Sequence, residues 1–180
     1  LEMGSNENCY GPSQSVHAAL ASQWTSLHRY PDPSGKALKS AIAATHGIDA
    51  AEIALGNGSH ELLMQLAQVF AGPEDEVLVS RYCFAVYPIA ATAVGARLVL
   101  AEALPADADM PLGHDLAAMA AGIGARTKLV FFANPNNPTG TWFSSAALEA
   151  FMANVPPHVL VVADEAYIEY VTDTGLASAL

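Results

Sequence analysis

Short apolar runs that alternate with helix-like stretches constrain the fold of this chain more than any other feature of its sequence. The runs are 75–80 ("DEVLVS"), 96–101 ("ARLVLA"), 128–133 ("KLVFFA") and 158–163 ("HVLVVA"). Each run is continuously apolar, which is typical of a strand covered on both faces. Strands connected through helices form right-handed crossovers and a parallel sheet. The pattern therefore predicts an α/β domain of three layers, in which a mostly parallel sheet is flanked by helices.

The segments between these runs carry the signals expected of helices. Ser34 is in position to cap a helix that runs to His46, where Gly47 ends it. The stretch "EIAL" (52–55) predicts one further short strand. Helices are expected at 14–28, 34–46, 60–71, 84–94 and 114–123, and from Ser144 or Ser145 to about Asn154.

The composition indicates a globular chain and excludes several classes of partner. Hydrophobic residues make up 52% and charged residues 14% of the 180 residues, which is a globular and not a disordered composition. A net charge of −11 with seven Lys and Arg argues against an extended nucleic-acid-binding face. No apolar run reaches the roughly 18 residues that span a bilayer, and no signal peptide is visible. We therefore expect neither a nucleic acid nor a membrane as partner.

The cysteines and histidines favour a cytoplasmic protein without a metal. Cys9 and Cys83 belong to no CxxC pair and are expected to be reduced thiols, with a disulfide as the alternative. The six histidines show no spacing typical of metal ligands. The chain begins with Leu1, and we expect it to be part of a longer protein.

Polar side chains follow the predicted strands at the edge of the sheet where ligands bind in such folds. In "GNGSHE" (56–61) the glycines and the start of the next helix favour a phosphate, although a plain turn is the alternative. Phe84 follows the strand 75–80 and is able to stack on a flat ring or to belong to the core.

Two further features lie at the same edge. In "NPNNPTG" (134–140), Asn137 is able to donate a hydrogen bond into the crevice. In "VVADEAY" (161–167) the apolar strand delivers Asp164, and Tyr167 follows three residues later. Asp164 either carries a buried charge toward a ligand or caps the next helix. Together the features predict a flat ring with a phosphate, a protonated nitrogen and a phenolic oxygen, which is the chemistry of pyridoxal phosphate.

The order and spacing of five motifs give the chain a family resemblance. It resembles the fold-type I pyridoxal-phosphate-dependent aminotransferases, and most closely their histidinol-phosphate aminotransferase group, over residues 1–180. The motifs are "NENCYGPS" (6–13), "RYPDP" (29–33), "GNGSHE" (56–61), "NPNNPTG" (134–140) and "VVADEAYIEY" (161–170).

The resemblance implies roles for residues around the cofactor ring. Asp164 is expected to pair with the pyridine nitrogen, and Asn137 and Tyr167 to hydrogen-bond the ring oxygen. Asp164 and Tyr167 are the expected catalytic residues of this chain. Phe84 is expected to stack on the ring, where the family usually has Tyr.

The resemblance also implies contacts beyond the ring. Backbone groups of Ser59 and His60 are expected to bind the cofactor phosphate. Tyr30 is expected to reach the cofactor phosphate of the neighbouring subunit, which implies a homodimer. Tyr10 is expected to line the substrate pocket.

The family's organisation implies two parts and a missing lysine. Residues 1–33 are expected to form an N-terminal arm and first helix at the small domain and dimer contact, and 34–180 the N-terminal part of the cofactor-binding large domain. The lysines of the chain all precede Asp164, whereas the Schiff-base lysine of the family follows it. We therefore expect that lysine, and the arginine that binds the substrate carboxylate, beyond Leu180.

The expected activity is transfer of an amino group between an amino acid or histidinol phosphate and a 2-oxo acid such as 2-oxoglutarate. The resemblance implies the histidinol-phosphate reaction of histidine biosynthesis. One alternative is a pyridoxal-phosphate lyase or decarboxylase on the same scaffold. Another is a non-catalytic regulatory module of this fold, which should follow a basic DNA-binding domain.

Overall fold

The computed structural model describes residues 5–180, and the chain divides into two compact units, Leu1–Ile53 and Ala54–Leu180. The domain boundary expected between residues 33 and 34 stays a prediction. The first unit contains α1 (Gln14–Gln23), η1 (Trp24–Ser26), α2 (Lys36–His46) and η2 (Ala50–Glu52).

Helix α2 begins at Lys36, two residues after the predicted cap Ser34, and a different side chain supports its start. The carboxylate of Asp32 accepts a hydrogen bond from the N–H of Lys36 at 3.0 Å, and the hydroxyl of Ser34 is bound to the same carboxylate. Ser34 is therefore not the cap, because its hydroxyl is used by Asp32. Helix α2 ends at Gly47 as predicted, with φ at 71°.

The short strand predicted at 52–55 is wrong. A capping box closes the preceding residues into the 3-10 turn η2. Asp49 accepts the N–H of Ala51 at 2.9 Å, and the carboxylate of Glu52 accepts the N–H of Asp49 at 3.3 Å. Within the turn, the N–H groups of Glu52 and Ile53 donate to the carbonyls of Asp49 and Ala50 at 3.0 and 3.4 Å, so they are not available to pair with a neighbouring strand.

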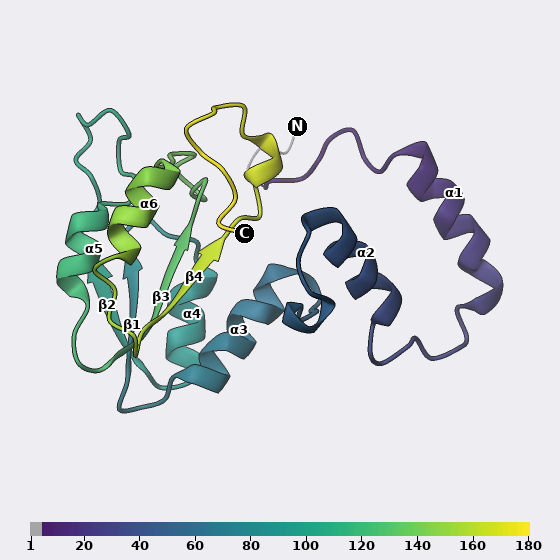
Figure 1. Cartoon of the computed structure of the whole chain (residues 1–180), viewed down its shortest axis with the longest axis horizontal. Coiled ribbons are helices and arrows are strands. Elements are labelled where there is room, and N and C mark those ends of the chain that lie inside the picture. Colours follow the sequence, from purple (N-terminus) through teal and green to yellow (C-terminus); the bar gives the residue numbers. More distant parts are fainter. Residues whose placement is uncertain (1–4) are drawn as a thin grey trace. The chain divides into compact units, whose positions relative to one another are not determined.

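The second unit has the predicted α/β architecture (Figure 1). Its strands form one parallel sheet in the order β2-β1-β3-β4. The elements of this unit are α3 (Gly58–Phe70), β1 (Glu76–Ser80), α4 (Val86–Ala93), β2 (Arg97–Ala101), α5 (Leu116–Gly122), β3 (Thr127–Ala133), α6 (Ser145–Met152), β4 (Leu160–Asp164) and η3 (Ile168–Tyr170).

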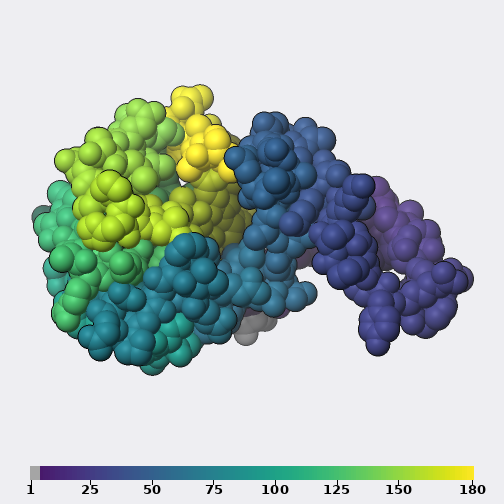
Figure 2. All heavy atoms as spheres, turned by 60° about the horizontal axis from the view of Figure 1, so that its bottom comes forward, coloured from purple at the N-terminus to yellow at the C-terminus, as the bar shows by residue number. Residues whose placement is uncertain are grey.

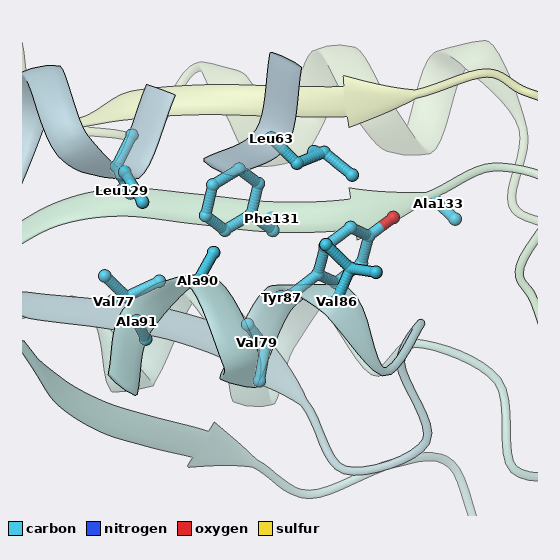
Figure 3. Packing of buried hydrophobic residues seen from close by; sticks show 11 residues of the cluster. Leu63, Val77, Val79, Val86, Tyr87, Ala90, Ala91, Leu129, Phe131 and Ala133 are labelled. Carbon is cyan, nitrogen blue, oxygen red and sulfur yellow. The ribbon is translucent and has the colours of Figure 1, made fainter. Parts of the chain in front are cut away.

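The core lies on both faces of the sheet, as the continuous apolar runs predict. On one face, side chains of α3 and α4 pack on alternate residues of β1 and β3, including Val77, Val79 and Phe131 (Figure 3). On the other face, Met119 and Phe151 of α5 and α6 pack on the residues between them. The space-filling view shows the teal, green and yellow atoms of this unit packed in contact with one another (Figure 2). Every residue of β1 is buried.

Ion pairs hold the amino edge of the sheet together. The buried carboxylate of Glu76, the first residue of β1, binds the guanidinium groups of Arg97 and Arg126. The hydrogen bond from Arg97 is the main cause that lowers the pKa of Glu76 below its usual range. Each of these charges therefore has a partner of opposite sign at the amino edge.

Within residues 5–180, neither unit contains a helix that is long and apolar enough to cross a bilayer.

Both cysteines are free thiols: Cys9 is exposed and Cys83 is half-buried. In the same described range, no group of three or more His, Cys, Asp or Glu side chains is arranged to hold a metal ion.

Candidate functional site

A small pocket opens at the carboxyl edge of the sheet and collects five of the residues singled out in the sequence. Its volume is about 50 Å³. A cavity of that size holds only a few waters, so a larger ligand must extend out of it. The pocket is lined by Ser59, Phe84, Ala133, Asn137, Asp164, Ala166 and Tyr167.

The register of β3 and β4 places Asp164 in this pocket. Ala133 and Asp164 are paired as the last residues of these strands, and the N–H of Asn134 donates to the carbonyl of Asp164 at 3.0 Å. The side-chain oxygen Oδ1 of Asp164 accepts the N–H of Ala166 at 3.2 Å. The next helical turn, η3, begins only at Ile168, so Asp164 does not cap it.

A residue that the sequence analysis missed supports this carboxylate. The hydroxyl of Tyr87 in α4 donates a hydrogen bond to Oδ2 of Asp164 at 2.9 Å. The Tyr87 side chain is fully buried. Burial, followed by the nearby charge of Asp164, raises the pKa of Tyr87 far above its usual value, so it remains a neutral donor. The i, i+3 spacing of Phe84 and Tyr87 was the only local signal that could have pointed to it.

The three asparagines of the "NPNNPTG" loop have different roles. Asn134 exchanges two hydrogen bonds with the backbone of Phe143, at 2.9 and 3.1 Å. Asn136 is buried and donates to the carbonyl of Tyr82 at 2.8 Å. Asn137 alone of the three lines the pocket. The interpretation that this run of amides faces a ligand therefore holds for one amide, and the other two shape the loop.

A buried histidine holds the end of β3 from the side. The Nε2 atom of His114 lies 3.1 Å from the carbonyl oxygen of Ala133, and the ring lies against Phe132 and Phe143. Burial lowers the pKa of His114 to about 4. The imidazole is therefore neutral at pH 7, and Nε2–H is the donor to that carbonyl.

The glycine-rich turn leads directly into α3. Gly58 has φ at 79°, and a Cβ there would meet nothing within 4 Å, so the backbone is open to a ligand. The first N–H groups of a helix lack partners inside it, and with the helix dipole they favour an anion. Ser59 lies in this first turn and lines the pocket, whereas the side chain of His60 is exposed.

The remaining predicted site residues belong to the first unit. The side chains of Tyr10 and Tyr30 are almost fully exposed, at 92% and 101%. Their expected contacts with a substrate and with a neighbouring subunit stay predictions.

The side chains in the pocket fit pyridoxal phosphate on chemical grounds. A carboxylate suits a protonated ring nitrogen, and an amide and a phenol suit a ring oxygen. Phe84 offers an aromatic surface, and the start of α3 suits a phosphate. Asp164, Asn137, Phe84 and Ser59 come from four different segments, and the parallel topology brings them to one edge.

Known aminotransferases resemble this chain in sequence and in structure. The sequence profile of the aminotransferase class I and II family matches residues 1–179. The chain is 49% identical to histidinol-phosphate aminotransferase 1 of Nitrosococcus oceani over 96% of its length, and 45% identical to histidinol-phosphate aminotransferase 1 of Idiomarina loihiensis over 100%. It spans 45% and 47% of those two proteins, which is about half of each.

A solved structure is also similar. The histidinol-phosphate aminotransferase of Sinorhizobium meliloti, in complex with pyridoxal-5'-phosphate, superposes with a TM-score of 0.88 at 32% identity. The match covers 96% of this chain and 46% of that protein.

Proposed function

Because this chain belongs to the class I and II aminotransferase family, we propose that the full-length protein containing it is a transaminase. It transfers the amino group of histidinol phosphate, or of a similar amino acid, to a 2-oxo acid such as 2-oxoglutarate. The name of the relatives supports histidinol phosphate as the donor. The observation that carries the proposal is the convergence of Asp164, Asn137, Tyr167, Phe84 and Ser59 on one pocket.

Pyridoxal phosphate is the proposed cofactor, and when bound it supplies an electron sink for the carbon that exchanges its amino group. The carboxylate of Asp164 holds a proton at the ring nitrogen. The amide of Asn137 and the phenol of Tyr167 line the pocket and would donate to the ring oxygen, and Phe84 would pack on the ring face.

The phosphate of the cofactor is assigned to the start of α3. The N–H groups of Ser59 and His60 face it there, since the first turn of a helix leaves such donors unpaired. The exposed side chain of His60 is no obstacle, because the contact is through the backbone.

The proposed enzyme is a cytoplasmic homodimer in which residues 1–33 belong to the small domain and dimer contact. Tyr30 of one subunit reaches the cofactor phosphate of the other, and Tyr10 lines the substrate pocket. The near-complete exposure of both rings is compatible with contacts made to another part of the assembly. Sedimentation of the full-length protein gives the subunit number. A Tyr30→Phe variant with unchanged cofactor affinity would contradict the role of Tyr30.

The activity is tested by supplying the purified full-length protein with pyridoxal phosphate, histidinol phosphate and 2-oxoglutarate. One glutamate should form for each histidinol phosphate converted to its ketone. Omitting 2-oxoglutarate should stop turnover after a single half-reaction. Continued product formation without an acceptor, or release of CO₂ from an amino acid, would instead identify a lyase or decarboxylase.

A further inference from the structure

The hydrogen bond between Tyr87 and Asp164 joins α4, the helix that connects β1 and β2, to the end of β4, across 77 sequence positions. It involves the carboxylate that lines the pocket and a phenol that is fully buried. Such a donor to an ionised carboxylate is stronger than a hydrogen bond between neutral groups. A buried phenol must also find a partner, and the fold offers Tyr87 this one.

The hydrogen bond from Tyr87 fixes the orientation of the Asp164 carboxylate, which the backbone alone does not determine. The χ2 torsion of an aspartate, which rotates the carboxylate plane, has a broad distribution with no sharply preferred value. The N–H of Ala166 holds only Oδ1 of Asp164, at 3.2 Å. With the hydroxyl of Tyr87 on Oδ2, both oxygens have a donor and the carboxylate plane is set.

The Tyr87 ring is itself held in place and touches a second pocket residue. It stacks on Phe131 with ring centres 5.3 Å apart and planes within 12°. The Tyr87 ring is also perpendicular to the Phe84 ring, with ring centres 5.7 Å apart. The backbone N–H of Tyr87 donates to the backbone carbonyl of Phe84 at 3.1 Å. Figure 3 shows the hydroxyl oxygen of Tyr87 pointing toward the end of β3 at Ala133.

The protonation states of Tyr87 and of the nearby Cys83 show that Tyr87 is the donor in this hydrogen bond. Burial and the charge of Asp164 raise the pKa of Tyr87 far above its usual value. Burial also raises the pKa of the neighbouring Cys83 thiol to about 11. Both groups are therefore neutral at pH 7, and Tyr87 donates to Asp164.

We propose that Tyr87 is a positioning residue, whose hydroxyl orients the Asp164 carboxylate toward the cofactor ring nitrogen and whose ring holds Phe84 in place. This inference rests on the proposed function. Because Tyr87 is fully buried, it acts through Asp164 and Phe84 and not by touching the cofactor.

A double-mutant cycle on cofactor affinity tests the inference. Tyr87→Phe removes the hydroxyl and keeps the ring on Phe131. In the full-length protein at pH 7.5, equilibrium dialysis with pyridoxal phosphate should show affinity reduced about tenfold or more, as expected for a hydrogen bond to a charged group. In an Asp164→Ala background, the same change should have less than about a twofold effect, because the acceptor is gone.

Spectroscopy separates positioning from general stability. With pyridoxal phosphate labelled with 15N in the ring, the nitrogen resonance should move toward its unprotonated position in Tyr87→Phe. In wild-type protein carrying 13Cζ-tyrosine, the Tyr87 Cζ resonance should move when the cofactor binds, which needs no substitution. Tyr82→Phe is the matched control, since it removes a phenol from an exposed side chain two residues before Phe84, and it should leave all three readouts unchanged.

The outcomes distinguish the two proposals. If wild-type protein does not bind pyridoxal phosphate, the proposed function is overturned together with this inference. If wild-type protein binds it, only the role of Tyr87 is at issue. An unmoved Cζ resonance contradicts that role, as does equal loss of affinity with and without Asp164.

Discussion

The side-chain amide of Asn136 donates to the main-chain carbonyl of Tyr82, and the two atoms lie 2.8 Å apart. This bond ties the loop after β3 to the loop after β1, across 54 sequence positions. The same amide donates to Oγ1 of Thr139 at 2.7 Å. Asn137 follows Asn136 directly, and Phe84 follows Tyr82 by two residues. The bond therefore sets the spacing between an amide and an aromatic ring that both line the pocket.

Asn136→Ala should lower the free energy of unfolding by about 1–3 kcal/mol, because it removes two hydrogen bonds from a buried side chain. Cofactor affinity should fall as well, since the two loops lose their connection. Urea unfolding of the apoprotein and dialysis with pyridoxal phosphate measure the two effects. Asn154→Ala is the matched control: its amide also donates to a backbone carbonyl, that of Ala150, but is exposed. An equal loss of stability in Asn154→Ala would mean that the hydrogen bond between the two loops stabilises the protein no more than an exposed one does.

Asp164→Ala should leave folding largely intact and lower kcat by about 10²–10³-fold, the range found when a preorganised polar partner of the reacting group is lost. Asp164 is the last residue of β4 and its side chain lines the pocket, so the sheet keeps its pairing without the carboxylate. Steady-state kinetics with saturating cofactor checks the prediction. The exposed Asp107→Ala is the control and should retain normal turnover. Near-normal kcat in Asp164→Ala with cofactor bound would remove Asp164 from the mechanism.

Asn137→Ala and Tyr167→Phe should each shift the pH dependence of the visible absorption of the bound cofactor. Each substitution removes a proposed donor to the ring oxygen and so changes the proton affinity of the cofactor. Both side chains line the pocket. Absorption spectra recorded across a pH series report the midpoint. If both variants titrate as the wild type does, neither residue faces the ring.

Much of the fold was predictable because each strand is defined by local sequence. The continuous apolar runs predicted all four strands of the described sheet to within two residues at each end. The failure at 52–55 has a local cause too, since Asp49 and Glu52 form a capping box that outweighs the short apolar stretch. Capping boxes are recognisable in sequence, and Asp49 and Glu52 have the spacing of one.

The site was predictable only in part, because its decisive bonds are long-range. Asp164, Asn137 and Phe84 follow strands, and the parallel topology alone predicts that they meet. The partner of Asp164 is a tyrosine 77 positions away inside a helix, where its sequence context indicates only core. The amides of Asn134 and Asn136 look the same in sequence as that of Asn137. Only their distances to Phe143 and Tyr82 separate loop structure from ligand contact.

His114 should make the stability of the protein depend on pH. Burial lowers the pKa of His114 in the folded state to about 4, from its ordinary value of 6.5. The unfolded state therefore binds more protons between these values, so stability is fully present above about pH 6.5 and is lost as pH falls toward 4. From pH 7 to pH 5 the loss attributable to His114 should be about 2 kcal/mol, by the linkage relation.

The measurement is urea unfolding of wild type and His114→Gln at pH 7 and pH 5. Glutamine keeps a donor for the Ala133 carbonyl and cannot take up the proton, so His114→Gln should lose much less stability than the wild type between pH 7 and pH 5. His17 is exposed, so the control variant His17→Gln should lose as much stability as the wild type. A penalty of the same size in His114→Gln would show that other groups cause the pH dependence.

The cofactor should be bound covalently to none of the lysines of this chain. Lys36 and Lys39 lie on α2 and precede Asp164 in the sequence, whereas the family resemblance implies a Schiff-base lysine that follows it. Lys128 is the second residue of β3, at the amino edge, and Ala133 ends the strand at the pocket. At about 3.3 Å per residue the two are about 16 Å apart along the strand, which is farther than a lysine side chain reaches.

Borohydride reduction of the full-length holoenzyme, followed by peptide mass mapping, identifies the lysine that holds the cofactor. We expect the pyridoxyl group on a lysine that follows Leu180 in the full-length protein. A Lys128→Arg variant is the control and should be labelled to the same extent as the wild type. Label on Lys128 would contradict the parallel register of β3, because a residue at the amino edge cannot share a cofactor with Asp164 at the carboxyl edge. Label on Lys36 or Lys39 would contradict the expectation that the Schiff-base lysine follows Asp164 in the sequence.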